Sequence, residues 1–151
     1  MINISIAEED INSSDATALI EELSRELGRI TGDSGQSSFT NTDLDIPRSL
    51  FVIARENGEA NGCGAFREIS TDIAEIKRMY ARKKSDGIGH KILHHLEEKA
   101  KELGYSKVIL ETRKCNERAV MFYLKNGYKV TINYGKYENL EESVCFEKYL
   151  C

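Results

Sequence analysis

One segment near the middle of the chain constrains the fold more than any other. Residues 74–81 read as a β-strand, and the segment 84–89 that follows contains two closely spaced glycines. From Ile88 onward the apolar residues recur at helical spacing as far as Leu103, and Gly104 ends the pattern. The sequence therefore predicts a strand, a glycine turn and an amphipathic helix in direct succession.

This glycine turn is suited to binding an anion. Gly87 and Gly89 lack a Cβ atom, so the backbone can turn sharply there and a ligand can approach it closely. The first turn of the helix adds unpaired N–H groups and the positive end of the helix dipole. Phosphate is the anion most often bound at such a place. Glycine turns also serve as plain connections between strand and helix, so the turn alone leaves both interpretations open.

A second motif makes the prediction specific. Its residues are Asn116, Ala119, Tyr123, Gly127 and Tyr128. Taken with Lys84, Gly87 and Gly89, it resembles the GNAT superfamily of acyl-CoA-dependent N-acyltransferases. That family has a Gln/Arg-x-x-Gly-x-Gly/Ala turn, followed by an Asn-x-x-Ala-x-x-x-Tyr-x-x-x-Gly-Phe pattern. The resemblance is detailed from about Phe51 onward, and Lys84 stands where the family usually has Arg or Gln.

The order of the expected elements agrees with the fold of that family. We expect strands at 3–7, 50–55, 62–69, 73–81, 107–112, 128–133 and 143–149, and helices at about 13–30, 88–103 and 117–125. This α/β (α+β) order predicts a single domain over residues 1–151, with one mixed, mostly antiparallel sheet flanked by helices. The resemblance implies that the sheet is splayed between strands four and five, with coenzyme A in the gap.

The resemblance also implies a coenzyme and the residues that bind it. Acetyl-CoA would be the co-substrate, and no metal is implied. The cofactor-binding residues would be Met79, Ala81, Lys84, Gly87, Ile88, Gly89, His90 and Asn116. Met79 and Ala81 would act through backbone groups that meet the pantetheine arm and the thioester carbonyl. Asn116 would contact the pantetheine and could also cap the following helix.

Tyr123 and Glu75 are the catalytic residues that the resemblance implies. Tyr123 would donate a proton to the coenzyme sulfur as general acid, although a core tyrosine bonded to backbone would give the same pattern. Glu75 would act as general base through water. Strict alternation along its strand would place Glu75 on the same face as Met79 and Ala81.

The role of Glu75 has alternatives. A glutamate at this place could simply pair with Lys77 or Arg113 at the surface of the sheet. Glu111 on the adjacent strand is the second candidate for the base, and water alone is a third. A free ammonium with a pKa near 10 would benefit from any of them at neutral pH.

Composition excludes several other classes of protein. A net charge of −4 and a pI near 5.5 argue against a nucleic-acid binder. The chain has neither a signal-peptide pattern nor an apolar run of membrane-spanning length, so we expect a cytoplasmic protein. Its four cysteines form no C-x-x-C pair, which favours free thiols in a reducing compartment. His90 and His94 have metal-compatible spacing but no third ligand at a suitable position.

The sequence thus predicts an acetyl-CoA-dependent N-acetyltransferase that acts on a primary amine of a small molecule, amino acid or peptide. The loops 32–47 and 134–142 would border the acceptor, with Asp43, Asp45, Tyr134 and Tyr137 as candidates there. A coenzyme A sensor or interaction module with weak turnover is the alternative. A domain for another nucleotide is disfavoured, because the chain lacks a Walker motif and a complete G-x-G-x-x-G.

We also expect a homodimer. The C-terminal strands, with Cys145, Phe146 and Tyr149, could offer a sheet edge to a second copy of the chain.

Overall fold

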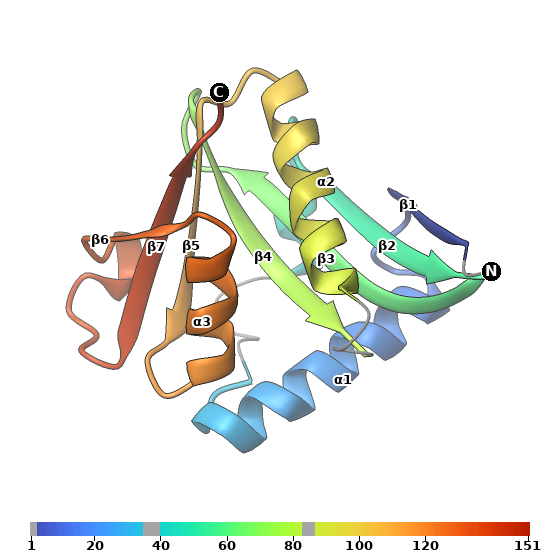
Figure 1. The fold of residues 1–151 in the computed structure, drawn as a ribbon, viewed down its shortest axis with the longest axis horizontal. Helices are drawn as coiled ribbons and strands as arrows, with labels where there is room; N and C mark the ends of the chain where they lie inside the picture. The colour runs from blue at the N-terminus through green and yellow to red at the C-terminus, as the bar shows by residue number, and fades with distance from the viewer. Residues whose placement is uncertain (1–2, 35–39, 83–86) are drawn as a thin grey trace.

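The computed structural model describes residues 3–34, 40–82 and 87–151, and Figure 1 shows one twisted sheet with helices on both faces. The strands are β1 (Ile4–Glu8), β2 (Leu50–Glu56), β3 (Glu59–Glu68), β4 (Ile73–Ala81), β5 (Lys107–Arg113), β6 (Lys129–Thr131) and β7 (Ser143–Tyr149). The helices are α1 (Ser14–Thr31), α2 (Ile88–Glu102) and α3 (Glu117–Lys125), with short 3₁₀ turns η2 (Asn41–Leu44) and η3 (Gly135–Tyr137). The strand order β1-β2-β3-β4-β5-β7-β6 confirms the expected fold class.

The sheet opens between β4 and β5, as expected. These two strands run parallel and pair only from Ile73 opposite Lys107 to Glu75 opposite Ile109. Beyond Glu75, β4 continues to Ala81 without β5 beside it, and the two strands diverge in Figure 1. Backbone groups on this edge of β4 are therefore available to something other than a neighbouring strand.

A β-bulge interrupts β4 just beyond this point. Arg78 has a φ of 59°, and the register between β3 and β4 shifts by one residue there. The bulge reverses the side-chain alternation, so Met79 and Ala81 pack against the hydrophobic cluster under α2. Glu75 lies on the opposite face of the strand, toward α1. The expectation that Glu75, Met79 and Ala81 share one face is therefore wrong.

The helices cover the two faces of the sheet unequally. Helices α2 and α3 pack on one face over the larger hydrophobic cluster, and α1 packs on the other over a smaller one (Figure 1). Helix α1 begins where the Ser13 hydroxyl accepts a hydrogen bond from the Ala16 N–H at 3.1 Å, and it ends at Gly32 with a φ of 80°. Helix α3 begins in the same way, because the Asn116 side chain accepts from the Ala119 N–H at 3.3 Å.

The C-terminal strand is not at an edge of the sheet. β7 lies between β5 and β6, so Cys145 and Phe146 are paired on both sides and buried. Cys145 and Phe146 therefore offer no free edge, whereas Tyr149 lies beyond the β6 pairs, is paired with β5 alone and is exposed. The edge strand is β6, which is only three residues long, although Val130 and Ile132 are exposed beside it. The homodimer itself stays a prediction.

Among the residues that the structure describes, no helix combines the length and the apolar character needed to cross a membrane.

Candidate active site

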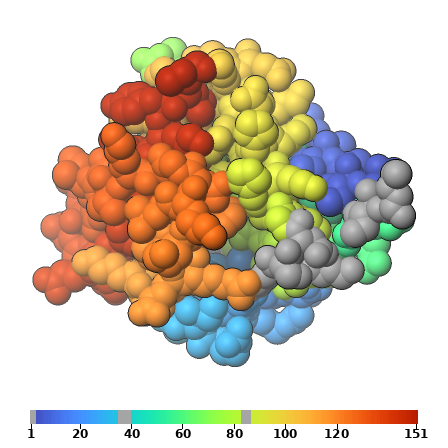
Figure 2. Space-filling view, in the orientation of Figure 1, coloured from blue at the N-terminus to red at the C-terminus, as the bar shows by residue number. Residues whose placement is uncertain are grey.

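Two adjoining cavities lie where β4 and β5 diverge. The first, here called the α2-side cavity, has a volume of about 490 Å³ and lies between the end of β4, the start of α2 and α3. The second, the β5-side cavity, has a volume of about 450 Å³ and lies between β4, β5 and η3. The residues that line both are Leu23, Leu27, Met79, Asn116, Ala119 and Tyr123. Figure 2 shows the surface hollowed where α3, the start of α2 and α1 meet.

Both glycines of the turn line the α2-side cavity, and each has a different structural role there. Gly87 has a φ of 71°, a conformation that L side chains rarely adopt, and this allows the chain to enter α2. A Cβ atom on Gly89 would lie 3.4 Å from two ring carbons of Phe122 on α3. Gly89 thus lies close to α3, beside the helix N-terminus that the sequence predicts for anion binding.

Of the other residues predicted to bind the cofactor, Met79, Ala81, His90 and Asn116 also line the α2-side cavity. Ile88 does not, because its side chain is buried in the core beneath α2. Lys84 lies outside the residues that the structure describes.

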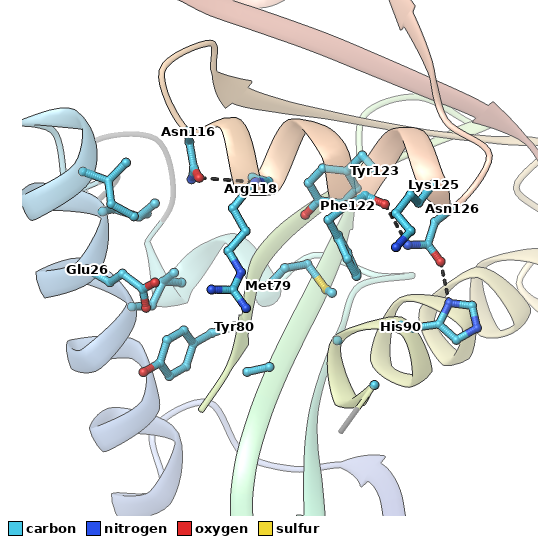
Figure 3. A pocket seen from close by; sticks show the side chains of 17 residues that line it. Glu26, Met79, Tyr80, His90, Asn116, Arg118, Phe122, Tyr123, Lys125 and Asn126 are labelled. Carbon is cyan, nitrogen blue, oxygen red and sulfur yellow. Dashed lines mark hydrogen bonds between the residues drawn. The ribbon is translucent and has the colours of Figure 1, made fainter. Parts of the chain in front are cut away.

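Polar side chains from helices α2 and α3 also line the α2-side cavity. The Nδ1 atom of His90 and the Oδ1 atom of Asn126 are hydrogen-bonded, which joins the start of α2 to the end of α3 (Figure 3). The cations Arg118 and Lys125 on α3 line the same cavity, and Figure 3 shows Arg118 reaching across it toward Glu26 and Tyr80. Arg118 and Lys125 are not among the site residues predicted from the sequence, although both lie within the segment of the second motif, 116–128.

Tyr123 lies at the junction of the two cavities. Its ring is fixed by aromatic neighbours, with centroids 5.1 Å from Phe122, 5.6 Å from Tyr128 and 6.0 Å from Phe146. Within the described residues, its hydroxyl has no hydrogen-bond partner. Burial raises the pKa of Tyr123, so the hydroxyl keeps its proton at neutral pH.

Glu75 lines neither cavity. Its carboxylate is buried, with one oxygen accepting from the Tyr134 hydroxyl at 2.6 Å and the other from Arg67 Nε at 3.0 Å. The Lys77 ammonium is 3.7 Å away, the pairing that the sequence offered as an alternative. Burial and the adjacent Glu75 carboxylate raise the pKa of Tyr134, so that hydroxyl remains a donor to Glu75.

Glu111 lines the β5-side cavity. Its Oε2 atom accepts from the Ser143 hydroxyl at 2.6 Å and from Arg113, which fixes the side chain. The Oε1 atom has no hydrogen-bond partner among the described residues. The structure therefore brings the second candidate base, rather than Glu75, to the wall of a cavity.

The β5-side cavity is rich in charge. Its cationic residues are Lys77, Arg78, Arg113 and Lys136, and its acidic residues are Asp33, Glu111 and Glu142. Of the four acceptor-side candidates from the loops, Tyr137 lines this cavity, whereas Tyr134 bonds to Glu75 and Asp43 pairs with Arg67 at 2.9 Å. Asp45 lines neither cavity.

The two histidines with metal-compatible spacing stack with ring centroids 6.5 Å apart. In residues 3–34, 40–82 and 87–151, no group of three or more His, Cys, Asp or Glu side chains is placed to hold a metal ion.

Comparison with known proteins places this fold and site in a family. Residues 16–128 match the model of the acetyltransferase (GNAT) family. The chain is 32% identical to an IAA acetyltransferase of Azospirillum brasilense over 99% of this chain and all of that protein. It superposes on the PaiA N-acetyltransferase of Thermoplasma acidophilum, solved with coenzyme A, with a TM-score of 0.75, 21% identity and coverage of 97% and 99% of the two chains.

A GNAT family acetyltransferase of Elizabethkingia anophelis, solved with acetyl-CoA bound, gives a TM-score of 0.73 at 20% identity, over 98% of this chain and 99% of that one. The family model matches most of this chain. The second motif of the sequence lies on α3, beside the point where β4 and β5 diverge. The chain therefore belongs to the acetyltransferase (GNAT) family of enzymes.

Proposed function

We propose that this protein transfers the acetyl group directly from acetyl-CoA to a primary amine while both are bound. The observation that carries the proposal is the junction of the two cavities at Met79 and Tyr123. One cavity would hold the coenzyme and the other the acceptor, so the reacting groups would meet without a covalent enzyme intermediate. Cys115, the exposed cysteine beside Asn116, lines neither cavity and has no part in this scheme.

The α2-side cavity suits the coenzyme. It offers the start of α2 at Gly87 and Gly89, and the cationic side chains of Arg118 and Lys125, for the phosphates of the coenzyme. Met79 and Ala81 lie on the part of β4 that β5 no longer pairs, so backbone groups there can meet the pantetheine arm. When bound, acetyl-CoA supplies the thioester that reacts.

Two side chains would move protons in this scheme. Glu111 lines the proposed acceptor cavity, and its Oε1 atom, which has no partner among the described residues, would take a proton from the incoming ammonium, directly or through water. Tyr123, protonated and at the junction, would give its proton to the leaving thiolate. Glu75, already occupied by Tyr134 and Arg67, would hold β4 and the loop after β6 together instead.

We place the enzyme in the cytoplasm. All four cysteines are free thiols, which fits a reducing compartment.

Thiol release tests the proposed function. The protein is incubated with acetyl-CoA and a panel of polyamines, aminoglycosides, amino acids and peptides, and free coenzyme A is measured against time. We expect amine-dependent release and an N-acetylated product of the acceptor by mass spectrometry. Tight acetyl-CoA binding by calorimetry without product from any amine would instead support a coenzyme A sensor.

A further inference from the structure

We infer that the acceptor amine also carries a carboxylate, as an amino acid does, and that Lys77 binds this carboxylate in the β5-side cavity. This inference rests on the proposed function and adds a substrate class to it. The observation behind it is a nearly buried ammonium on the cavity wall whose hydrogen-bonding capacity the protein only partly uses.

Lys77 has one side-chain hydrogen-bond partner among the residues that the structure describes. Its side chain is 9% exposed, and Nζ donates to the Tyr137 hydroxyl at 3.0 Å. An ammonium has three donors, so one neutral partner leaves capacity for an anion. Glu75 at 3.7 Å is beyond hydrogen-bond length, and both of its oxygens already accept from Tyr134 and Arg67. Glu75 therefore forms an ion pair with Lys77 without taking up one of its hydrogen-bond donors.

Further cations surround this ammonium. Arg78 and Lys136 line the same cavity. Arg67 does not line it but forms an ion pair with Glu75 at 3.0 Å. Burial lowers the pKa of Lys136, and the charges of Lys77 and Arg67 lower it further. Burial likewise lowers the pKa of Lys77, while the carboxylates of Glu75 and Glu111 raise it and the charges of Arg67 and Arg78 lower it. Lys77, Arg78 and Lys136 thus give this wall of the cavity three cationic groups that a bound carboxylate would meet.

The other side of the cavity has the opposite character. Arg113 is paired with Asp33 at 2.8 Å and with Glu111, so its charge is already neutralised there. Glu111 lines the cavity, and within the described part of the chain its Oε1 atom has no hydrogen-bond partner. A positive wall on β4 and a carboxylate on β5 fit a ligand that has both an anion and an ammonium. The amino group would then lie at Glu111, on the wall that leads to Tyr123.

Paired acceptors test the inference. Glycine, methionine, phenylalanine, β-alanine and γ-aminobutyrate are each compared with the matching carboxamide, at equal concentrations of unprotonated amine. We expect the wild-type protein to prefer the free acid, and Lys77→Met to reduce the acid-to-amide ratio of kcat/KM by about 10- to 100-fold, the range for a charged hydrogen bond. The loss should lie in KM for the acid, with kcat and the amide reactions little changed. Lys77→Arg should retain part of the preference.

The control is Lys129→Met, which removes an exposed lysine on β6, away from both cavities. Equal rates for acids and amides in the wild-type protein, or an unchanged ratio in Lys77→Met, would overturn the inference while leaving the acetyltransferase proposal standing. If no member of the panel is acetylated, the same acids and amides are titrated into the protein saturated with coenzyme A and followed by saturation-transfer NMR. Binding of the acids that depends on Lys77 supports the inference, and its absence overturns it.

Discussion

The hydroxyl of Tyr134 donates a 2.6 Å hydrogen bond to Glu75 across the start of the splay. With Arg67 on the other oxygen, this contact leaves the Glu75 carboxylate enclosed by protein. On the adjacent strand, Glu111 lines the β5-side cavity, with one oxygen held by Ser143 and Arg113 and the other without a partner among the described residues. The two carboxylates are chemically alike, and their different partners are the basis for proposing a structural role for Glu75 and a catalytic role for Glu111.

Glu111→Gln should therefore impair chemistry at neutral pH. Removing a general base lowers kcat/KM by about 100-fold or more, and raising the pH should restore part of the rate, because the acceptor then supplies its own unprotonated amine. The measurement is a pH–rate profile of the variant beside wild type. Glu142→Gln, on the exposed rim of the same cavity, serves as the control and should keep the wild-type profile.

Glu75→Gln should act on stability instead. Its amide cannot form the ion pair with Arg67, and a buried partner is left poorly satisfied. We expect a lower melting temperature by circular dichroism with a largely preserved kcat at a temperature where the variant is folded. A stable Glu75→Gln variant with a kcat as low as that of Glu111→Gln would show instead that Glu75 is the general base.

Gly89→Glu should abolish binding of acetyl-CoA. The new side chain would start 3.4 Å from Phe122 and place an anion at the wall of the α2-side cavity, where the phosphates are proposed to bind. Gly89→Ala adds only the Cβ atom and should bind nearly as wild type, which makes it the matched control. Both are compared by calorimetry, with circular dichroism to show that they fold. Wild-type affinity in a folded Gly89→Glu protein would rule out an anion site at this turn.

Glu22 should stabilise the protein in a pH-dependent way. Its carboxylate accepts from Arg82 at 2.6 and 2.8 Å and from Tyr80 at 3.1 Å, and so ties α1 to the end of β4. The Arg82 hydrogen bond lowers the pKa of Glu22 from its ordinary value of 4.5. The stabilisation is present above that value and is lost as the pH falls through the lower pKa of the folded state.

Glu22→Gln should accordingly have a lower melting temperature than wild type at pH 7, with a difference that shrinks in acid. Thermal melts from pH 7 down to pH 3.5 measure this, and Glu21→Gln at the exposed neighbouring position should show no such difference. A gap between wild type and Glu22→Gln that stays constant below pH 4 would contradict the assignment.

The fold was accessible from the sequence because its main signals are local. The apolar spacing after Ile88 predicted α2, and Asn116 was identified as the start of α3, where its side chain caps the helix. The splay followed from the family resemblance, and the short pairing of β4 with β5 confirms it. Tyr123 could be named for the same reason, since it belongs to the second motif.

The side chains and backbone conformation around the site could not be predicted from the sequence. The bulge in β4 depends on a φ of 59° at Arg78, and an arginine gives no compositional sign of such a backbone. The bulge moves Met79 and Ala81 to the other face of the strand, which strict alternation cannot anticipate. The partner that encloses Glu75 lies 59 residues away along the chain, so only the folded structure shows that this carboxylate is occupied.

The central claim is that Tyr123, at the junction of the two cavities, gives its proton to the leaving thiolate. Tyr123→Phe keeps the ring and its packing against Phe122, Tyr128 and Phe146, and removes only the hydroxyl. The decisive measurement is single-turnover thiol release with saturating acetyl-CoA and amine, together with the affinity for acetyl-CoA. The account predicts a rate lower by about 10- to 1,000-fold with nearly unchanged affinity. An unchanged single-turnover rate in a folded variant would contradict it and leave Tyr123 as a core residue.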